Sequence, residues 1–451
     1  MELKFDYNNK IDILKEISNK LKKKKFIIDE NYDKFGFDTI ELLSKVKNTS
    51  EVKGYPLVAR KITSKLLKGI GIGLKVIPIE SKYNKEEHPS NIEIIVLKEL
   101  TKHIINTNLS PHIVYYLDDK KIYNKSKAIK FLNLQQLERE FEIKNYSKLL
   151  ISEFVEGNSL DNWIYNRYKN DNKILKIEWI NILFQIIYTL EIIQKKYKLM
   201  HNDLHYGNIL IDTSLPSKGY IVYKIYNKTY YIKNYGYIPK IWDWEFSMIY
   251  SNNLKDGYLN KYITGSSIID KKNCLVKEYI TNDNESLNDI NVPYKYNEYY
   301  DLHYFLCSLL DLHISNDIND WILNLYHADL IPNNYSNSSS NSSTSSDSSS
   351  DSSSDSSSDS SSGSSSGSSR SGSLSGSLSD SSSYSSSGSS SGSSIYKETM
   401  YLYDGRLKMR VFDKFNNLPT PKMLLNDEIF NLLLIKPDDF DENEALFFNF
   451  N

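Results

Sequence analysis

A polar loop between a long apolar helix and a short apolar strand constrains the fold of this chain more than any other feature. Before the loop, apolar residues recur at the spacing of one helix face: Ile180, Leu183, Phe184, Ile187 and Leu190. The loop runs from His201 to Asn208, and the apolar run Ile209–Ile211 follows it. Four residues separate Asp203 from Asn208, so a loop can aim these two polar side chains at neighbouring points. The sequence therefore predicts a buried helix and a strand that together present one polar site.

A second acidic residue follows a second strand-like segment. The apolar approach to Asp243 ends between two tryptophans, Trp242 and Trp244. Taken alone, an aspartate at the end of a strand is most often an ordinary surface residue. Carboxylate and amide oxygens are also the ligands that Mg²⁺ takes in proteins, and acidic side chains beside an anionic ligand need a cation to offset their repulsion. Asp243 is therefore a candidate functional residue together with Asp203 and Asn208, and its role as a metal ligand is what the resemblance described next implies.

These segments resemble the catalytic core of the protein-kinase-like superfamily. The loop has the pattern His-x-Asp-Leu-x-x-x-Asn, an apolar strand follows, and the metal aspartate comes after a tyrosine-rich segment, Gly219–Ile232. Alternating aromatic and polar residues predict that this segment is a β-hairpin with its turn at Asn227 and Lys228. The chain is most similar to divergent serine/threonine-protein kinases of large DNA viruses. The resemblance covers residues 50 to 330 and then the C-terminal tail.

The resemblance implies an α+β fold of two lobes, with a small, β-rich N-terminal lobe and a larger, mainly helical C-terminal lobe. It implies that the chain binds ATP and Mg²⁺ and moves the γ-phosphate to a hydroxyl group, most directly a serine or threonine of a protein substrate. Asp203 would accept the hydroxyl proton, and His205 would be a second catalytic residue. Asn208 and Asp243 would hold the metal. Asp301 would open a helix and bond the backbone of the loop, although Asp is also a favoured N-cap.

A lysine inside an apolar strand is a candidate phosphate-binding residue. Lys75 lies within Gly73–Pro78, and a buried ammonium is costly unless it is paired. Glu93 follows on a segment whose apolar residues recur at helical spacing. By the resemblance, Lys75 contacts the nucleotide phosphates and pairs with Glu93. Glu99 on the same helix is the competing partner. Glu93 is preferred because the kinase pattern places a leucine four residues after the paired glutamate, where this chain has Leu97.

The segment Leu149–Gly157 resembles the hinge that links the two lobes of a kinase. An apolar strand runs into a short acidic turn, and a helix is expected to start at Ser159–Trp163. Backbone groups near Glu153 and Val155 would meet the adenine edge of ATP. This cofactor-binding role therefore requires no particular side chain.

The phosphate-covering loop is the poorest match to the kinase pattern. Backbone N–H groups cradle phosphates best where side chains are absent, so a glycine-rich loop is expected before Lys75. Only Gly54 is present there, and we expect a degenerate loop around residues 48–54. Gly69, Gly71 and Gly73 lie too close to Lys75 for this role and predict a flexible connection into the strand.

Composition narrows the other possibilities. The formal net charge of −2 gives no argument for binding nucleic acid or an anionic membrane. No apolar run is long enough for a membrane span, and Met1–Asp6 lacks the apolar core of a signal peptide. Cys274 and Cys307 do not have metal-ligand spacing and indicate a reducing compartment. We expect a cytoplasmic protein, in the host cytoplasm or the virion if the chain is viral.

The segment 335–394 consists almost entirely of serine, with glycine and a repeating Asp-Ser-Ser-Ser unit, and it divides the chain. It has too few apolar groups to form a core, so we expect a disordered insert, with a phosphoacceptor tract as the sharper alternative. We expect a helical N-terminal extension at 1–45, the N-terminal lobe at 46–150 and the C-terminal lobe at 151–334. Residues 395–451 would complete that lobe, and Leu418–Phe430 resembles the last helix of a protein-kinase domain.

Departures from the protein-kinase pattern leave two alternatives open. His205 stands where serine/threonine kinases usually carry lysine, and Asp243-Trp244-Glu245 lacks the glycine of Asp-Phe-Gly. Both features are closer to aminoglycoside and choline kinases, so a small-molecule kinase is one alternative. The eroded glycine loop motivates the other, a non-catalytic pseudokinase that binds partners. The presence of Lys75, Asp203, Asn208 and Asp243 together argues for catalysis.

Overall fold

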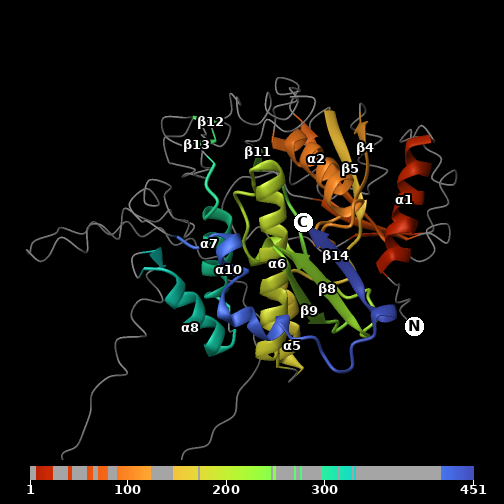
Figure 1. Cartoon of the computed structure of the whole chain (residues 1–451). Coiled ribbons are helices and arrows are strands. Elements are labelled where there is room, and N and C mark those ends of the chain that lie inside the picture. The colour runs from red at the N-terminus through yellow and green to blue at the C-terminus, as the bar shows by residue number, and fades with distance from the viewer. Residues whose placement is uncertain are drawn as a thin grey trace, which may run out of the picture. The chain divides into compact units, whose positions relative to one another are not determined.

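The computed structural model describes residues 7–23, 39–42, 58–63, 70–79, 89–122, 146–170, 173–244, 247–249, 269–270, 275–276, 296–312, 314–327, 330–331 and 418–450. These residues form the mixed helices and strands of an α+β protein (Figure 1). The expected glycine loop at 48–54 and the serine-rich segment 335–394 lie outside them, so both remain predictions. Within these ranges, no helix combines the length and the apolar character that a membrane span needs.

An antiparallel sheet of five strands forms the N-terminal part. Its order is β1-β2-β3-β5-β4, and the strands are β1 (Thr39–Leu42), β2 (Val58–Thr63), β3 (Ile72–Ile79), β4 (Tyr116–Ile122) and β5 (Tyr146–Glu153). Lys75 lies on the central strand β3, opposite Leu150 of β5. Helix α2 (Pro89–Leu100) lies beside the sheet (Figure 1). Strand β1 pairs with β2 although it falls within residues 1–45, so the sheet begins inside the segment expected to be a helical extension.

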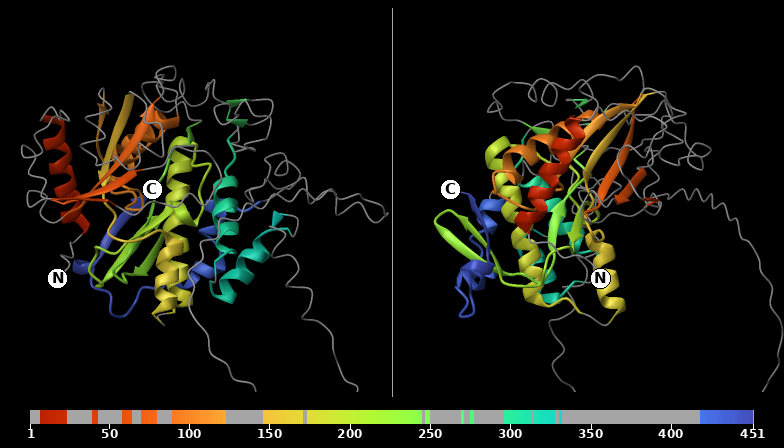
Figure 2. Two further views of the ribbon diagram at one scale, coloured as in Figure 1. Left: turned by 180° about the vertical axis from the view of Figure 1, so that it is seen from behind. Right: turned by 90° about the vertical axis from the view of Figure 1, so that its right-hand side faces the viewer.

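Helix α1 (Tyr7–Lys23) packs against the outer strand β4 (Figure 2). Its apolar side chains face the body of the protein and are buried: Ile11, Ile13, Leu14, Ile17 and Leu21. The Ser18 hydroxyl donates to the carbonyl of Leu117, with 2.7 Å between the two oxygens. The helix is therefore an integrated part of the fold.

Glycines allow the start of β3 to lie close to the end of β5. A Cβ atom at Gly73 would lie 3.1 Å from Ser152 Oγ and 3.2 Å from the Glu153 carbonyl oxygen. The Phe154 N–H donates to the Gly71 carbonyl, with 3.0 Å between nitrogen and oxygen. Gly73 is thus a paired strand residue, and our expectation of a flexible connection at this position was wrong.

Helix α6 (Lys176–Tyr197) is buried along nearly its whole length, as the apolar spacing predicted. The chain then passes into the polar loop and the strand that follows it, through β6 (Leu199–Met200), the 3-10 turn η5 (Tyr206–Asn208) and β7 (Ile209–Asp212). Antiparallel partners flank this loop, since β7 pairs with β10 (Ile238–Ile241) and β6 with β11 (Met248–Ile249). Helix α5 (Leu160–Lys169) packs against η5 and β7. The loop is therefore held at both ends.

The tyrosine-rich segment forms the expected hairpin, with its turn one residue earlier than predicted. Strands β8 (Tyr220–Ile225) and β9 (Lys228–Lys233) are joined by Tyr226 and Asn227, whose φ angles are 52° and 61°. A two-residue turn with positive φ at both positions matches the twist of the two strands, so turn geometry sets the register. Strand β14 (Leu446–Phe450) pairs with β8 in parallel and completes a three-stranded sheet (Figure 2).

The C-terminal segment differs from expectation. Instead of one helix over Leu418–Phe430, the chain forms the short helix α10 (Pro421–Leu424) and the 3-10 helix η10 (Glu428–Leu434). Asp427 explains the break, because its carboxylate accepts from the Ile429 N–H and starts a new turn. The remaining elements are α7 (Tyr300–Leu309), α8 (Asn316–Leu325), the π-helix η4 (Thr101–Ile105), the 3-10 helix η11 (Glu442–Glu444), β12 (Ile269–Asp270) and β13 (Leu275–Val276).

Candidate active site

Asp203 and Asn208 meet within the polar loop, as their spacing predicted. The Asn208 Nδ2 atom donates to the Asp203 carbonyl oxygen at 2.8 Å and to Asp203 Oδ2 at 3.1 Å. The Asn208 backbone N–H donates to the His205 carbonyl at 2.9 Å, closing the turn between them. Because Asp203 engages the amide nitrogen of Asn208, the amide oxygen is the atom that can face another ligand.

Asp301 anchors the backbone of this loop. Its Oδ2 accepts from the His201 N–H at 2.7 Å and its Oδ1 from the Asn202 N–H at 2.8 Å. Asn202 has φ 66°, an uncommon conformation that these two bonds support. Burial raises the pKa of Asp301 to about 7, while the two N–H donors oppose that shift. The contact expected from the resemblance is therefore present, and it is structural.

The second acidic residue reaches the loop through the pairing of β7 with β10. The Trp242 N–H donates to the Asn208 carbonyl at 3.1 Å, and His201 Nε2 lies 2.9 Å from the Trp242 carbonyl oxygen. Asp243 follows with φ 65°, which turns the chain away from the strand direction. The structure thus brings Asp243 beside Asn208, although the β8–β9 hairpin lies between them in sequence.

Lys75 joins the N-terminal sheet to this site. Its Nζ atom lies 2.6 Å from Glu93 Oε2 and 2.8 Å from Asp243 Oδ1. Burial alone would raise the pKa of Asp243, but the charge and hydrogen bond of Lys75 hold it below its usual value. Glu99, the competing partner, is part-exposed and lies 3.3 Å from His103 instead. The structure therefore contains the Lys75–Glu93 pair that the sequence favoured.

His205 lies next to Asp203 in a fixed orientation. Its Nδ1 atom accepts from the Gly207 N–H at 3.0 Å, so in the neutral ring the proton is on Nε2. That Nε2 lies 3.9 Å from Asp203 Oδ2. A Cβ atom at Gly207 would lie only 2.7 Å from His205 Cε1, so the glycine makes room for the ring. The imidazole can thus present an N–H beside Asp203.

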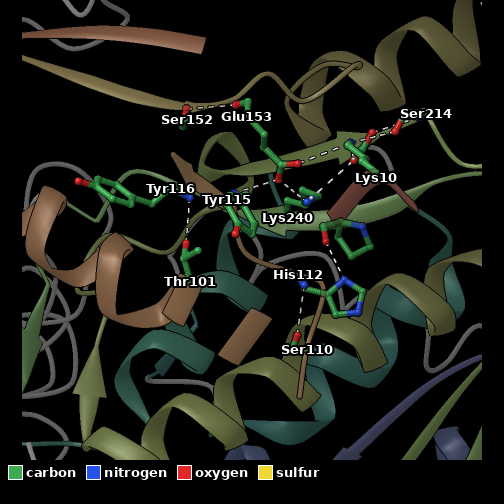
Figure 3. A network of polar contacts seen from close by, with 12 residues as sticks. Lys10, Thr101, Ser110, His112, Tyr115, Tyr116, Ser152, Glu153, Ser214 and Lys240 are labelled. Carbon is green, nitrogen blue, oxygen red and sulfur yellow. Dashed lines mark hydrogen bonds and ion pairs between the residues drawn. The ribbon is translucent and has the colours of Figure 1, made fainter. Parts of the chain in front are cut away.

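The side chains of the two candidate hinge residues, Glu153 and Val155, are buried, so only their backbone groups could meet a ligand. Glu153 is 2% exposed; its carboxylate pairs with Lys240 and accepts from the Tyr115 N–H at 3.0 Å (Figure 3). Its carbonyl accepts from the Ser152 hydroxyl at 3.1 Å. Val155 is also buried, and its carbonyl accepts from the Gly157 N–H at 2.9 Å. The Glu153 side chain therefore faces the protein interior. Gly54, the other cofactor-binding candidate, lies outside the described residues.

Sequence reasoning missed a group of buried charges behind the hinge. Lys240 of β10, Asp212 of β7 and Lys10 of α1 lie together with Glu153. A signal for Lys240 was present, because it stands in an apolar strand in the same way as Lys75. Lys10 and Asp212 had no comparable signal, since their partners are distant in sequence.

The donor set near Asp243 fits a hard divalent cation. In the described ranges, no cluster of three or more His, Cys, Asp or Glu side chains is arranged to hold a metal. Mg²⁺, however, usually takes one or two protein ligands and completes its shell with phosphate oxygens and water. The Asp243 side chain is 19% exposed, so its carboxylate reaches the surface of the site. Asn208 offers the amide oxygen described above.

Comparison with known proteins places these residues in context. No family model matches the chain. Two proteins of Acanthamoeba polyphaga mimivirus, each named "Putative serine/threonine-protein kinase", are similar to it. One is 28% identical over 242 residues, which are 49% of this chain and 46% of the relative. The other is 26% identical over 229 residues, 42% of this chain and 58% of the relative. The chain thus spans about half the length of these relatives.

One solved kinase domain aligns weakly with part of this chain. The BubR1 kinase domain aligns over 48% of this chain and 49% of that chain, at 13% identity and a TM-score of 0.30.

Proposed function

We propose that this chain, which is a divergent kinase-like protein, transfers the γ-phosphate of ATP to a hydroxyl group in a reaction that needs a divalent cation. The observation that supports this most is the position of Lys75 between two carboxylates, at 2.6 Å from Glu93 and 2.8 Å from Asp243. These three residues come from distant segments, and a paired lysine next to a candidate metal ligand is the arrangement that phosphate binding requires.

The nucleotide would lie between the hinge and the metal residues. Lys75, held by Glu93, would contact the phosphates as a point charge. Backbone groups of Glu153 and Val155 would meet the adenine edge, since the side chain of Glu153 is turned inward. In this arrangement the sheet and the helices around α6 would act as the two lobes of a kinase, with the hinge between them.

Asn208 and Asp243 would hold the cation, and Mg²⁺ is the ion that their oxygen ligands favour. When bound, the cation would neutralise charge on the transferred phosphoryl group. The hydrogen bonds from Asn208 Nδ2 to Asp203 would hold the proposed metal ligand beside the residue that takes the proton.

Asp203 would orient the acceptor hydroxyl and take its proton. The Nε2–H of His205 lies on the same side and would donate a hydrogen bond to the transferring group or to Asp203. Catalysis would then rest on positioning and on charge stabilisation, and no covalent enzyme intermediate is needed. We propose a serine or threonine of a protein as the acceptor, in keeping with the names of the mimivirus relatives.

Nucleotide binding is the first test. The melting temperature of the full chain and of Asp243→Ala would be measured with ATP and Mg²⁺, separately and together. A ligand that binds only the folded state raises the melting temperature by mass action. We expect a shift that needs both ligands and is lost in the variant. No shift at millimolar ATP would overturn the proposal and leave a partner-binding role.

Transfer is the second test. With labelled ATP and a general protein acceptor, wild type should label protein, and Asp203→Ala should bind nucleotide normally without transferring phosphate. Turnover close to wild type in Asp203→Ala would exclude Asp203 as the residue that takes the proton.

A small-molecule acceptor is a second candidate, favoured by one observation. His205 occupies the position where protein kinases usually carry lysine, and the structure fixes its neutral tautomer through Gly207. Aminoglycoside and choline kinases resemble the chain in this loop. Labelled-ATP assays on a panel of amino alcohols and aminoglycosides would separate the two candidates, because only a small-molecule kinase would saturate with such an acceptor.

A further inference from the structure

Four charged side chains from four different elements, Lys10, Glu153, Asp212 and Lys240, meet behind the hinge. Figure 3 labels three of them, Lys10, Glu153 and Lys240. Lys10 Nζ lies 2.6 Å from Asp212 Oδ2 and 3.6 Å from Glu153 Oε2, and it donates to Ser214 Oγ at 3.0 Å. Lys240 Nζ bonds Glu153 Oε1 and lies 4.0 Å from Asp212 Oδ2. The four side chains are each at most 3% exposed. They therefore form one closed buried network.

The charges of the network balance when all four members are present, and the loss of any single member leaves a net buried charge. Two carboxylates face two ammonium groups, and a buried charge without its partner is strongly unfavourable. Burial would raise the pKa of Asp212, but the charges of Lys10 and Lys240 hold it below its usual value. Lys10 contacts both Asp212 and Glu153, so this residue links helix α1 to the two acids of the network.

Each strand in this network leads to a part of the candidate site. Glu153 is the last residue of β5 and lies within the hinge segment. Asp212 ends β7, which begins after Asn208, and Lys240 lies on β10, three residues before Asp243. The network thus joins the strand that carries the hinge to the two strands that carry the metal residues.

Helix α1 brings Lys10 to this place through contacts of its own. Ser18 bonds the Leu117 carbonyl of β4, as described above. At the other end of the helix, the Tyr7 ring meets the edge of Phe448 on β14, with 5.5 Å between ring centroids. The helix is therefore fixed at both ends, and Lys10 extends from it into the interior.

We propose that α1 is a positioning element of the nucleotide site and that Lys10 is its positioning residue. Lys10 holds the hinge strand at a set spacing from the strands of Asn208 and Asp243, and the nucleotide must bridge that spacing. This inference rests on the proposed function, because it assigns the bridged ligand as a nucleotide. It makes the N-terminal helix a determinant of nucleotide affinity, although α1 supplies no group that touches the nucleotide.

The test separates positioning from simple stabilisation. Lys10→Met leaves Asp212 and Glu153 with one lysine, so both stability and ATP affinity should fall. The double variant Lys10→Met/Asp212→Asn restores the charge balance, since Glu153 and Lys240 remain paired. We expect the double variant to recover most of its melting temperature, while its Kd for ATP with Mg²⁺ stays at least about fivefold above wild type, the lower end of coupling between separate sites. Lys20→Met, which alters only the exposed pair with Glu16, is the matched control.

Calorimetric titration of the full chain would give the Kd values, and turnover at saturating ATP should stay near wild type in the double variant. Recovery of both melting temperature and affinity would overturn the inference, because α1 would then act only through stability. Hydrogen exchange of the backbone amides, measured without nucleotide, tests the position of the hinge independently of binding. The amides of residues 153–157 should exchange faster in the double variant than in wild type. If wild type binds no ATP, the proposed function fails, whereas unchanged exchange at 153–157 would refute the inference itself.

Discussion

Lys75 Nζ lies 2.8 Å from Asp243 Oδ1, although the two residues are 168 positions apart in sequence. The same ammonium lies 2.6 Å from Glu93, and it sits 4.9 Å from the centroid of the Trp242 ring. One lysine therefore connects the N-terminal sheet, helix α2 and the end of strand β10. Its removal would disturb all three elements.

Lys75→Met should lower turnover by at least about a hundredfold, since a preorganised charge aimed at the transferring group contributes on this scale. It should also cost about 3–5 kcal/mol of stability, because the buried Glu93 carboxylate would lose the ammonium group that lies 2.6 Å from it. Urea denaturation and labelled-ATP assays would measure the two effects.

The double variant Lys75→Met/Glu93→Gln is the control for the loss of stability. It removes the negative charge of residue 93, so it should regain much of the stability and remain inactive. A double variant that regained activity as well would show that Lys75 acts only in folding.

Asp301→Ala should loosen the catalytic loop. The variant loses two hydrogen bonds from backbone N–H groups to the buried carboxyl group, which together contribute about 2 kcal/mol to stability. Turnover should fall further than nucleotide affinity, because the loop carries Asp203 while the hinge is unaffected. Urea denaturation would measure the loss of stability, and steady-state kinetics would measure turnover and nucleotide affinity. The variant Asp317→Asn, at an exposed aspartate, is the control. Equal losses in the two variants would contradict the anchoring role.

Buried histidines should each reduce stability in mild acid, whereas the raised pKa of Asp301 acts in the opposite direction below about pH 7. Burial lowers the pKa of His112 to about 3, and its ring lies 2.8 Å from the Pro239 carbonyl oxygen and 2.7 Å from the Tyr223 hydroxyl. An unfolded histidine titrates near pH 6.5, so between about pH 6.5 and 3 the unfolded state binds a proton that the folded state does not. The stability from His112 is present above pH 6.5 and is lost as the pH falls through this range.

The expected slope is about 1.4 kcal/mol per pH unit from this one residue. Burial likewise lowers the pKa of His303, to about 4. His303 should therefore add a further loss of stability between about pH 6.5 and 4. Urea denaturation at pH 7, 6 and 5 would give the slope, and His112→Asn should reduce it. A slope that did not change in His112→Asn would mean that His112 is already charged in the folded protein.

Gly207→Ala should impair the site without unfolding the chain. The new Cβ atom would lie 2.7 Å from His205 Cε1, so the ring must leave its present position beside Asp203. We expect a fall in turnover of about tenfold, the scale of a small displacement of a catalytic group. The double variant His205→Ala/Gly207→Ala removes the clash, and its turnover should match that of His205→Ala alone. An additive loss in the double variant would show that Gly207 acts independently of His205.

Some features could be read from the sequence because they depend on local patterns. Helix α6 follows from the period of its apolar residues, and the β8–β9 hairpin follows from its alternating aromatic residues. The Lys75–Glu93 pair could also be anticipated, because a lysine in an apolar strand needs a partner and the following helix offered two. Backbone geometry limited the accuracy of these predictions. Positive φ at Tyr226 and Asn227 moved the hairpin turn by one residue, and the Asp427 cap broke the expected last helix.

The sequence by itself identified the loop from His201 to Asn208 as a candidate site, because the residue types and spacings of this loop lie within a few neighbouring positions. Only the tertiary structure decided which distant charges share one buried space. Lys10, Glu153, Asp212 and Lys240 come from four elements, and nothing in the local pattern of any one identifies the other three. Burial makes each of them depend on the rest, because an ammonium or carboxylate removed from water is stable only beside its opposite charge. That dependence arises when the chain folds, so it is absent from any single segment of the sequence.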